Sequence, residues 1–139
     1  MSKFVSNFKW IMLICGLLTC SMFLGLFSPA ASLQMNFGEE LGSSGYENII
    51  VRGWSALIGL TGIMLIYGAF KPAVRAYSLV IAGISKAIFI TLVLSYGSQY
   101  NSYGVGTAVI VDFIMIFLFI LYLLFEGRLK EEKNTRSID

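Results

Sequence analysis

The chain has 139 residues and a formal net charge of +2; 57% of its residues are hydrophobic and only 13% are charged. A soluble domain carries about a quarter charged residues, so this composition excludes an ordinary soluble fold and indicates an integral membrane protein. The sequence has no His and only two Cys, which excludes the usual zinc, haem and iron–sulfur sites. It has no basic face of the kind that binds nucleic acid. We therefore expect no metal, no other cofactor and no nucleic-acid partner.

The first apolar run covers residues 10–27 and follows a short basic tail. As a helix it would be about 27 Å long, close to the ~30 Å hydrocarbon core of a bilayer. The basic start and the small residues Ser28 and Ala30 also fit a cleaved signal peptide, but the run is long for one, so we expect a retained membrane helix. Cys15 and Cys20 point in different directions on this helix, and we expect them to pack as small residues without bonding to each other.

The segment 28–50 interrupts the apolar pattern with Pro29, three Gly and three carboxylates, and it contains no Lys or Arg before the second helix. This pattern predicts an outward loop, with a short amphipathic turn around residues 33–41 at the membrane surface. The same segment could instead cap the mouth of the bundle. Either arrangement offers outer-loop partners for a basic residue at the start of the next helix, namely Glu39, Glu40 and Glu47.

Three further apolar helices are predicted after this loop, over residues 51–70, 76–96 and 104–125. A basic turn that contains a proline separates the second helix from the third, and a proline at this place breaks the helix as a hairpin requires. The third and fourth helices are joined by an uncharged loop, 97–103. The remaining residues, 126–139, form a charged tail that we expect to be frayed and cytoplasmic.

The distribution of Lys and Arg predicts the orientation. Two lie in the N-terminal tail, two in the 71–75 turn and four in the C-terminal tail, whereas the loops 28–50 and 97–103 have none. By the positive-inside rule, both termini and the middle turn are cytoplasmic and the two long loops face outward. The predicted fold is an all-α integral membrane protein: an antiparallel bundle of four transmembrane helices in residues 1–125.

Two charged residues fall deep inside the predicted spans, Lys86 in the third and Asp112 in the fourth, whereas Arg52 is at the start of the second. An ionisable side chain in hydrocarbon costs about 2.5–3.5 kcal/mol on insertion scales, so each requires a partner, a water-filled cavity or a function. The helix rise places Lys86 about 15 Å below Tyr96 and Asp112 about 12 Å below Gly104, at nearly equal depth. We therefore expect an ion pair. Ala108, one turn before Asp112, is small enough to let the helices approach closely.

This pair has two interpretations. A buried ion pair can simply fix the register of two helices, which is the best-attested use of buried charge. Ionisable residues inside a membrane are, however, also candidates for binding a polar ligand or a proton. Arg52 lies near the predicted outer boundary, where it could reach a loop carboxylate or extend to the lipid head groups.

The chain resembles the DoxX-like superfamily of small bacterial four-helix membrane proteins, and specifically an uncharacterised branch of it. The resemblance rests on Arg52-Gly53-Trp54 before a glycine-containing second helix, on Gly83 to Lys86 in the third and on Asp112 in the fourth. That branch more often has Arg in place of Lys86 and Glu in place of Asp112. The resemblance implies a multi-pass protein of the bacterial inner membrane with a polar centre of Arg52, Lys86 and Asp112. Some relatives are membrane partners of oxidoreductases in thiol- or quinone-linked chemistry.

The sequence favours a small non-enzymatic protein, either an accessory subunit or a binder of a small amphipathic ligand of the lipid or quinone type at this centre. Its partners would be membrane lipids and a second copy or another membrane protein. A small proton-coupled transporter that uses Asp112 is the alternative. A membrane enzyme or oxidoreductase partner ranks lower, because catalysis needs a nucleophile and a base within reach, and the chain offers few candidates.

Overall fold

The computed structural model describes residues 2–136, all of whose regular elements are helical. Four helices in this part of the chain are long and apolar enough to cross a membrane: Lys3–Phe27, Gly45–Phe70, Pro72–Tyr96 and Gly104–Leu129. Many large apolar side chains of these helices are exposed, as expected where lipid and not water is the solvent. The chain is therefore built as a multi-pass membrane protein.

The first span consists of α1 (Ser2–Cys20), a 3₁₀ turn (Ser21–Phe23) and α2 (Leu24–Phe27). It ends at Ser28, because Pro29 disfavours the helical conformation of the residue before it and then begins a new helix at its first position. Both cysteines of this span are free thiols, as predicted.

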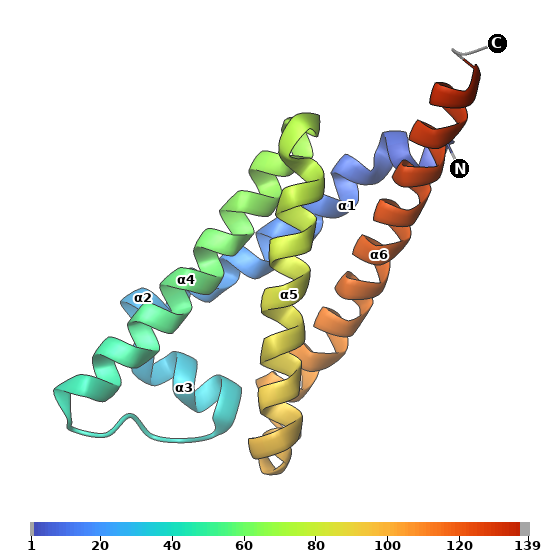
Figure 1. Cartoon of the computed structure of the whole chain (residues 1–139). Helices are drawn as coiled ribbons and strands as arrows, with labels where there is room; N and C mark the ends of the chain where they lie inside the picture. The colour runs from blue at the N-terminus through green and yellow to red at the C-terminus, as the bar shows by residue number, and fades with distance from the viewer. Residues whose placement is uncertain (1, 137–139) are drawn as a thin grey trace.

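The segment 28–50 is not only a loop. Pro29–Phe37 forms a helix, α3, which ends at Gly38 in the left-handed conformation, with φ of 70°. Glycine adopts this conformation without the steric penalty that a Cβ atom brings. The helix thus has the length of the predicted amphipathic turn, residues 33–41, but lies four residues earlier in the chain. Figure 1 shows α3 set across the end of the spans opposite the chain termini.

The second and third spans are α4 (Gly45–Phe70) and α5 (Pro72–Tyr96). α4 starts before the predicted residue 51, with Glu47 in its first turn, where the helix dipole favours a negative charge. Lys71 alone separates the two helices; its backbone is extended, and Pro72 takes the first position of α5. Helix α5 therefore begins four residues before the predicted 76.

The fourth span lies in α6 (Gly104–Arg136), which follows a short 3₁₀ turn, Ser98–Tyr100. The helix continues past residue 125 into the charged segment that we predicted to be frayed, and the final residues 137–139 lie outside the described part of the chain. The extension carries charged side chains at i, i+3 and i, i+4 spacings, which favour helix. Figure 1 shows both ends of the chain at the same end of the molecule.

Helix α1 packs mainly on α4, and small residues allow this contact. A Cβ atom on Gly62 would lie 2.6 Å from the backbone nitrogen of Cys20 and 2.7 Å from the carbonyl oxygen of Gly16. The ring of Phe23 lies against Gly59 in the same way. Gly59 and Gly62 on the second span therefore serve helix packing within the chain.

Two apolar clusters hold the spans together at different depths. The larger, near the chain termini, includes Phe8 and Tyr122, whose rings stack with centroids 4.3 Å apart and join α1 to α6. The smaller includes Ile90 and Val105 and joins α5 to α6 toward the opposite end. Lys86 and Asp112 lie between these two clusters.

Candidate functional site

Lys86 and Asp112 form the ion pair that the sequence predicted. The Lys86 ammonium donates to Asp112 Oδ1 at 2.5 Å, and the two side chains are only 9% and 14% exposed. The small residues around them allow α5 and α6 to approach, since Ala82 is fully buried and Gly83 faces the ring of Phe119. The pair carries no net charge, so its combined cost in an apolar interior is lower than that of either charge alone.

A cavity of about 280 Å³ lies beside this ion pair. Its walls come from all four spans and from α3, represented by Thr19 on α1, Asn36 on α3, Trp54 on α4, Lys86 on α5 and Asp112 on α6. Apolar surface dominates the walls, and the polar groups are few. A mostly apolar cavity with a small number of converging polar groups is the usual form of a small-molecule site.

The cavity is not closed. Several of its lining side chains are exposed, among them Leu18 on α1, Ser21 on the 3₁₀ turn after it, Ser85 on α5 and Thr107 on α6. All four of these residues belong to membrane-spanning segments. Met35 on α3, outside the spans, is exposed as well. The cavity is therefore open between helices that are long and apolar enough to cross a membrane, and in a bilayer we expect lipid beside this opening.

Several polar side chains of the wall present acceptors to the cavity. The hydroxyls of Thr19, Ser21 and Thr61 donate to carbonyls of their own helix at 2.8, 2.7 and 3.1 Å. The Asn36 amide nitrogen donates to the Ser32 carbonyl at 2.8 Å, which leaves its oxygen as an acceptor. Lys86 is the charged donor of the site, because an ammonium has three N–H bonds and Asp112 takes one of them.

Arg52, the third predicted member of the centre, is placed elsewhere. Its guanidinium donates to the carbonyl oxygen of Leu26, close to the end of α2 where the helix leaves its carbonyls unpaired. Of the described residues, those that line the cavity include Lys86 and Asp112 but not Arg52. Arg52 thus ties the start of α4 to the end of the first span, and this pairing could not be read from charge complementarity because the partner is backbone.

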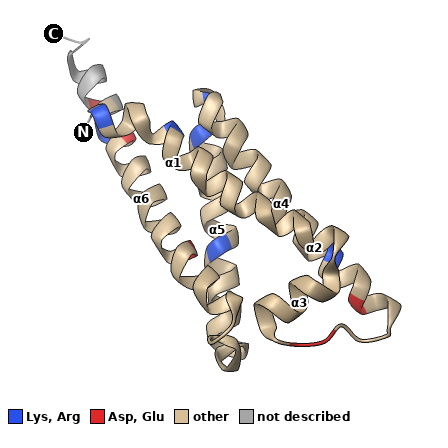
Figure 2. Ribbon diagram, turned by 180° about the vertical axis from the view of Figure 1, so that it is seen from behind, with Lys and Arg blue, Asp and Glu red and all other residues tan. Residues whose placement is uncertain are grey.

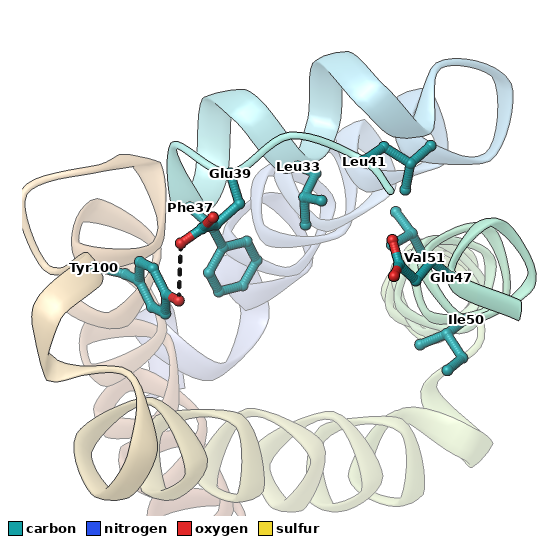
Figure 3. A pocket seen from close by; sticks show the side chains of 8 residues that line it. All are labelled: Leu33, Phe37, Glu39, Leu41, Glu47, Ile50, Val51 and Tyr100. Atoms are coloured by element: carbon teal, nitrogen blue, oxygen red, sulfur yellow. Dashed lines mark hydrogen bonds between the residues drawn. The ribbon is translucent and has the colours of Figure 1, made fainter. Parts of the chain in front are cut away.

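The predicted outer-loop carboxylates also have partners other than Arg52. Glu47 accepts from the backbone N–H of Gly42 at 2.7 Å, and Glu39 accepts from the Tyr100 hydroxyl at 3.1 Å, whereas Glu40 is exposed. Glu39 and Glu47 lie on the wall of a second, more open cavity of about 310 Å³ at the α3 end of the molecule, seen in Figure 3. These contacts order the connection between α3 and α4.

Arg75 is a buried cation that the sequence reading treated only as part of a basic turn. It is 8% exposed, and its guanidinium donates to the carbonyls of Gly68 and Ala69 at 3.2 and 2.8 Å. It also lies over the Tyr122 ring, 5.9 Å from the centroid. Arg75 therefore satisfies the last carbonyls of α4 and connects them to α6.

Sequence reasoning missed the contributions of Asn36 and Trp54 to the cavity. Asn36 falls in the segment predicted as a loop, and Trp54 entered only through the family resemblance, but both line the cavity. Trp54 packs between Phe37 and Phe89, with ring centroids 5.9 and 6.4 Å away. One signal could have found part of the wall: single hydroxyl residues such as Thr61 recur inside otherwise apolar spans. Comparison with known proteins adds no further site residue. No protein-family model, no curated protein and no solved structure matches this chain.

Proposed function

We propose that this protein is a non-enzymatic membrane protein that binds a small amphipathic ligand in the cavity beside Lys86 and Asp112. One observation carries the proposal: an intramembrane ion pair forms part of the wall of a cavity that opens toward lipid. A purely structural pair would be expected to be packed on all sides, because empty space beside buried charges forfeits both dispersion contacts and solvation.

The orientation we propose has both termini in the cytoplasm of a bacterial cell, with the spans in an antiparallel bundle in the inner membrane. Figure 2 supports it: most of the basic ribbon lies at the end with both termini, while the connection between α3 and α4 carries acidic residues. In this orientation the cavity lies in the outward half of the membrane. Membership of the DoxX-like superfamily would be consistent with these features.

Within the cavity, Lys86 would bind an oxygen atom of the ligand with its remaining N–H bonds. Asp112 would hold the ammonium in place, because its carboxylate accepts a hydrogen bond from Lys86 at 2.5 Å. The apolar walls would take the adjoining carbon atoms of the ligand. The volume of about 280 Å³ is close to the lower end of the ~300–1,000 Å³ typical of small-molecule sites, so part of a longer ligand would remain in the bilayer.

Native mass spectrometry of the protein extracted gently from its own membranes tests this proposal. We expect a discrete extra mass on the wild-type protein. Ala108→Leu fills the cavity with apolar side chain and should remove that mass, because Ala108 lines the cavity. Ala87→Leu is the matched control: it makes the same change on an exposed surface of α5 and should retain the mass.

Two results would contradict ligand binding at this site. One is a bound mass that Ala108→Leu retains at the wild-type occupancy. The other is a stoichiometric protein partner with no small molecule, which would identify an accessory subunit and return the Lys86–Asp112 pair to a structural role.

A further inference from the structure

The polar groups around the cavity differ from those expected for an ionic ligand. Lys86 and Asp112 neutralise each other, so the site offers no net charge to attract an anion or a cation. An anion would face the Asp112 carboxylate, and a cation would face the Lys86 ammonium, each in a low-dielectric interior where like charges repel strongly. The charge balance therefore favours an uncharged ligand.

The wall offers both acceptors and donors. Thr19, Ser21 and Thr61 donate their hydroxyl protons to carbonyls of their own span, and the Asn36 amide nitrogen donates to Ser32, which leaves the side-chain oxygens of these residues to accept from a ligand. Ser85, Thr107 and Trp54 also line the cavity and carry O–H or N–H groups. A ligand that brings only acceptors, such as an ester or a simple carbonyl, would leave the acceptor oxygens of the wall unmatched, whereas hydroxyl groups can donate to these oxygens and also accept from Lys86.

Size and access restrict the ligand further. A cavity of about 280 Å³ has the volume of about nine water molecules at the ~30 Å³ that each occupies in the liquid, which suits a head group and not a whole lipid. The exposed lining residues Leu18 and Thr107 belong to membrane spans, so a chain attached to that head group would extend into the bilayer through the side opening.

From these observations, and resting on the proposed function, we infer that the ligand is a lipid with an uncharged head group that carries hydroxyls, such as a monoacylglycerol. The head group lies in the cavity, with one hydroxyl oxygen accepting from Lys86. Its hydroxyl protons are directed at wall oxygens, including that of Thr61. The acyl chain passes out between the helices into the membrane.

Trp54 provides the readout, because it lines the cavity and only one other Trp, Trp10, is present. Trp10→Phe leaves Trp54 as the sole tryptophan. This protein would be placed in nanodiscs of dimyristoylphosphatidylcholine, a lipid with no hydrogen-bond donor in its head group. Bromine atoms quench tryptophan on contact, so stearoyl chains brominated on the two carbons next to the carboxyl carbon, which lie nearest the head group, report binding at the cavity. The probes are the monoacylglycerol, the fatty acid, the fatty amine and the methyl ester, all with the same brominated chain.

We expect the brominated monoacylglycerol to quench Trp54 saturably and at the lowest concentration of the four probes. Thr61→Val should weaken its binding about fivefold, the effect of one lost hydrogen bond, while leaving the affinity for the methyl ester unchanged. Thr91→Val is the matched control: Thr91 makes the same bond to its own helix, at 2.8 Å to Ala87, but is exposed and lies outside the cavity lining.

The outcomes separate this inference from the function on which it rests. Saturable quenching that is strongest for the acid, the amine or the ester overturns the hydroxyl head group but leaves ligand binding in place. Equal quenching by all four probes also overturns it. If none of the four quenches saturably, both the inference and an amphiphile site at this cavity are wrong. Native mass spectrometry of the unmodified protein with the same unbrominated lipids repeats the comparison without any substitution.

Discussion

Lys86 and Asp112 share a single hydrogen bond of 2.5 Å in a setting where neither charge has ready access to water. The pair can therefore have two roles: it stabilises charge in the interior of the bundle, and it can bind a ligand in the cavity. Removing one partner leaves the other without compensation, which costs far more than removing both. This asymmetry makes the pair open to a double-mutant cycle.

We expect Lys86→Ala to destabilise the folded protein by about 3 kcal/mol or more, since a lone Asp112 would remain in the apolar interior. The double variant with Asp112→Ala should recover most of this loss, to within about 1 kcal/mol of the wild type. Unfolding measured by tryptophan fluorescence in nanodiscs gives both values. Lys71→Ala, at an exposed lysine, is the control and should have little effect. Additive losses in the double variant would show that the two residues are not coupled.

The double variant also separates structure from function. If it folds but shows no ligand mass, the pair binds ligand as well as holding α5 to α6. If it folds and keeps the ligand at wild-type occupancy, the pair is structural and the apolar wall alone binds the ligand. Both interpretations of the double variant require that the helices around the cavity keep their positions.

At the scale of elements, the contact between α1 and α4 depends on backbone approaching backbone. Gly62 faces the Cys20 nitrogen and the Gly16 carbonyl, with no room for a side chain. The first span in turn supplies the α1 wall of the cavity, including Thr19. Close packing of one pair of helices is therefore a condition for the shape of the site.

A pair of glycine substitutions in α4 tests this dependence. Gly62→Ala places a Cβ atom 2.6 Å from a backbone nitrogen, so α1 must move away, and we expect a loss of about 1–3 kcal/mol, as for other overpacked sites. Gly53→Ala is the control on the same helix. A Cβ atom there meets nothing within 4 Å, and the gain in helix propensity should stabilise the protein slightly. Thermal unfolding of the two variants should shift in opposite directions; equal shifts would contradict the close contact.

Helix α3 is the element that differs most from the sequence prediction. The segment 28–50 was predicted to be mainly a loop because Gly and Ser residues are frequent after Gly38. Pro29 occupies the first position of α3, but a proline indicates a helix start only when the residues after it are known to be helical. The helix matters because it brings Asn36 to the cavity and sets Phe37 against Trp54.

At the scale of the whole molecule, the basic residues are distributed unevenly between the two ends. Figure 2 shows most of the basic ribbon at the end with both termini, whereas the connection between α3 and α4 carries acidic residues. This asymmetry predicts one orientation in the membrane. In the proposed orientation, the opening of the cavity would lie in the outward half of the bilayer, and the outer leaflet would supply the ligand.

Labelling of single cysteines in intact cells tests the orientation. In a background with Cys15→Ala and Cys20→Ala, a cysteine placed by Ser102→Cys should react with a membrane-impermeant maleimide from outside. One placed by Arg128→Cys should react only after the membrane is permeabilised. Both positions are exposed in the structure, so a difference in labelling reports the side of the membrane. The reverse pattern would place the termini outside.

The sequence by itself determined the four spans and the partnership of Lys86 with Asp112. Hydropathy identifies a segment that lipid can solvate, and the cost of isolated charge in hydrocarbon leaves each ion one sensible partner at equal depth. Composition could not determine where Arg52 and Arg75 bind, because their partners are backbone carbonyls of Leu26, Gly68 and Ala69, which every sequence has. Only the tertiary structure decided that a cavity exists, since empty space depends on how helices diverge and not on any residue type. The acceptor oxygens of its wall come together only when Thr19, Asn36 and Thr61 converge from three different helices.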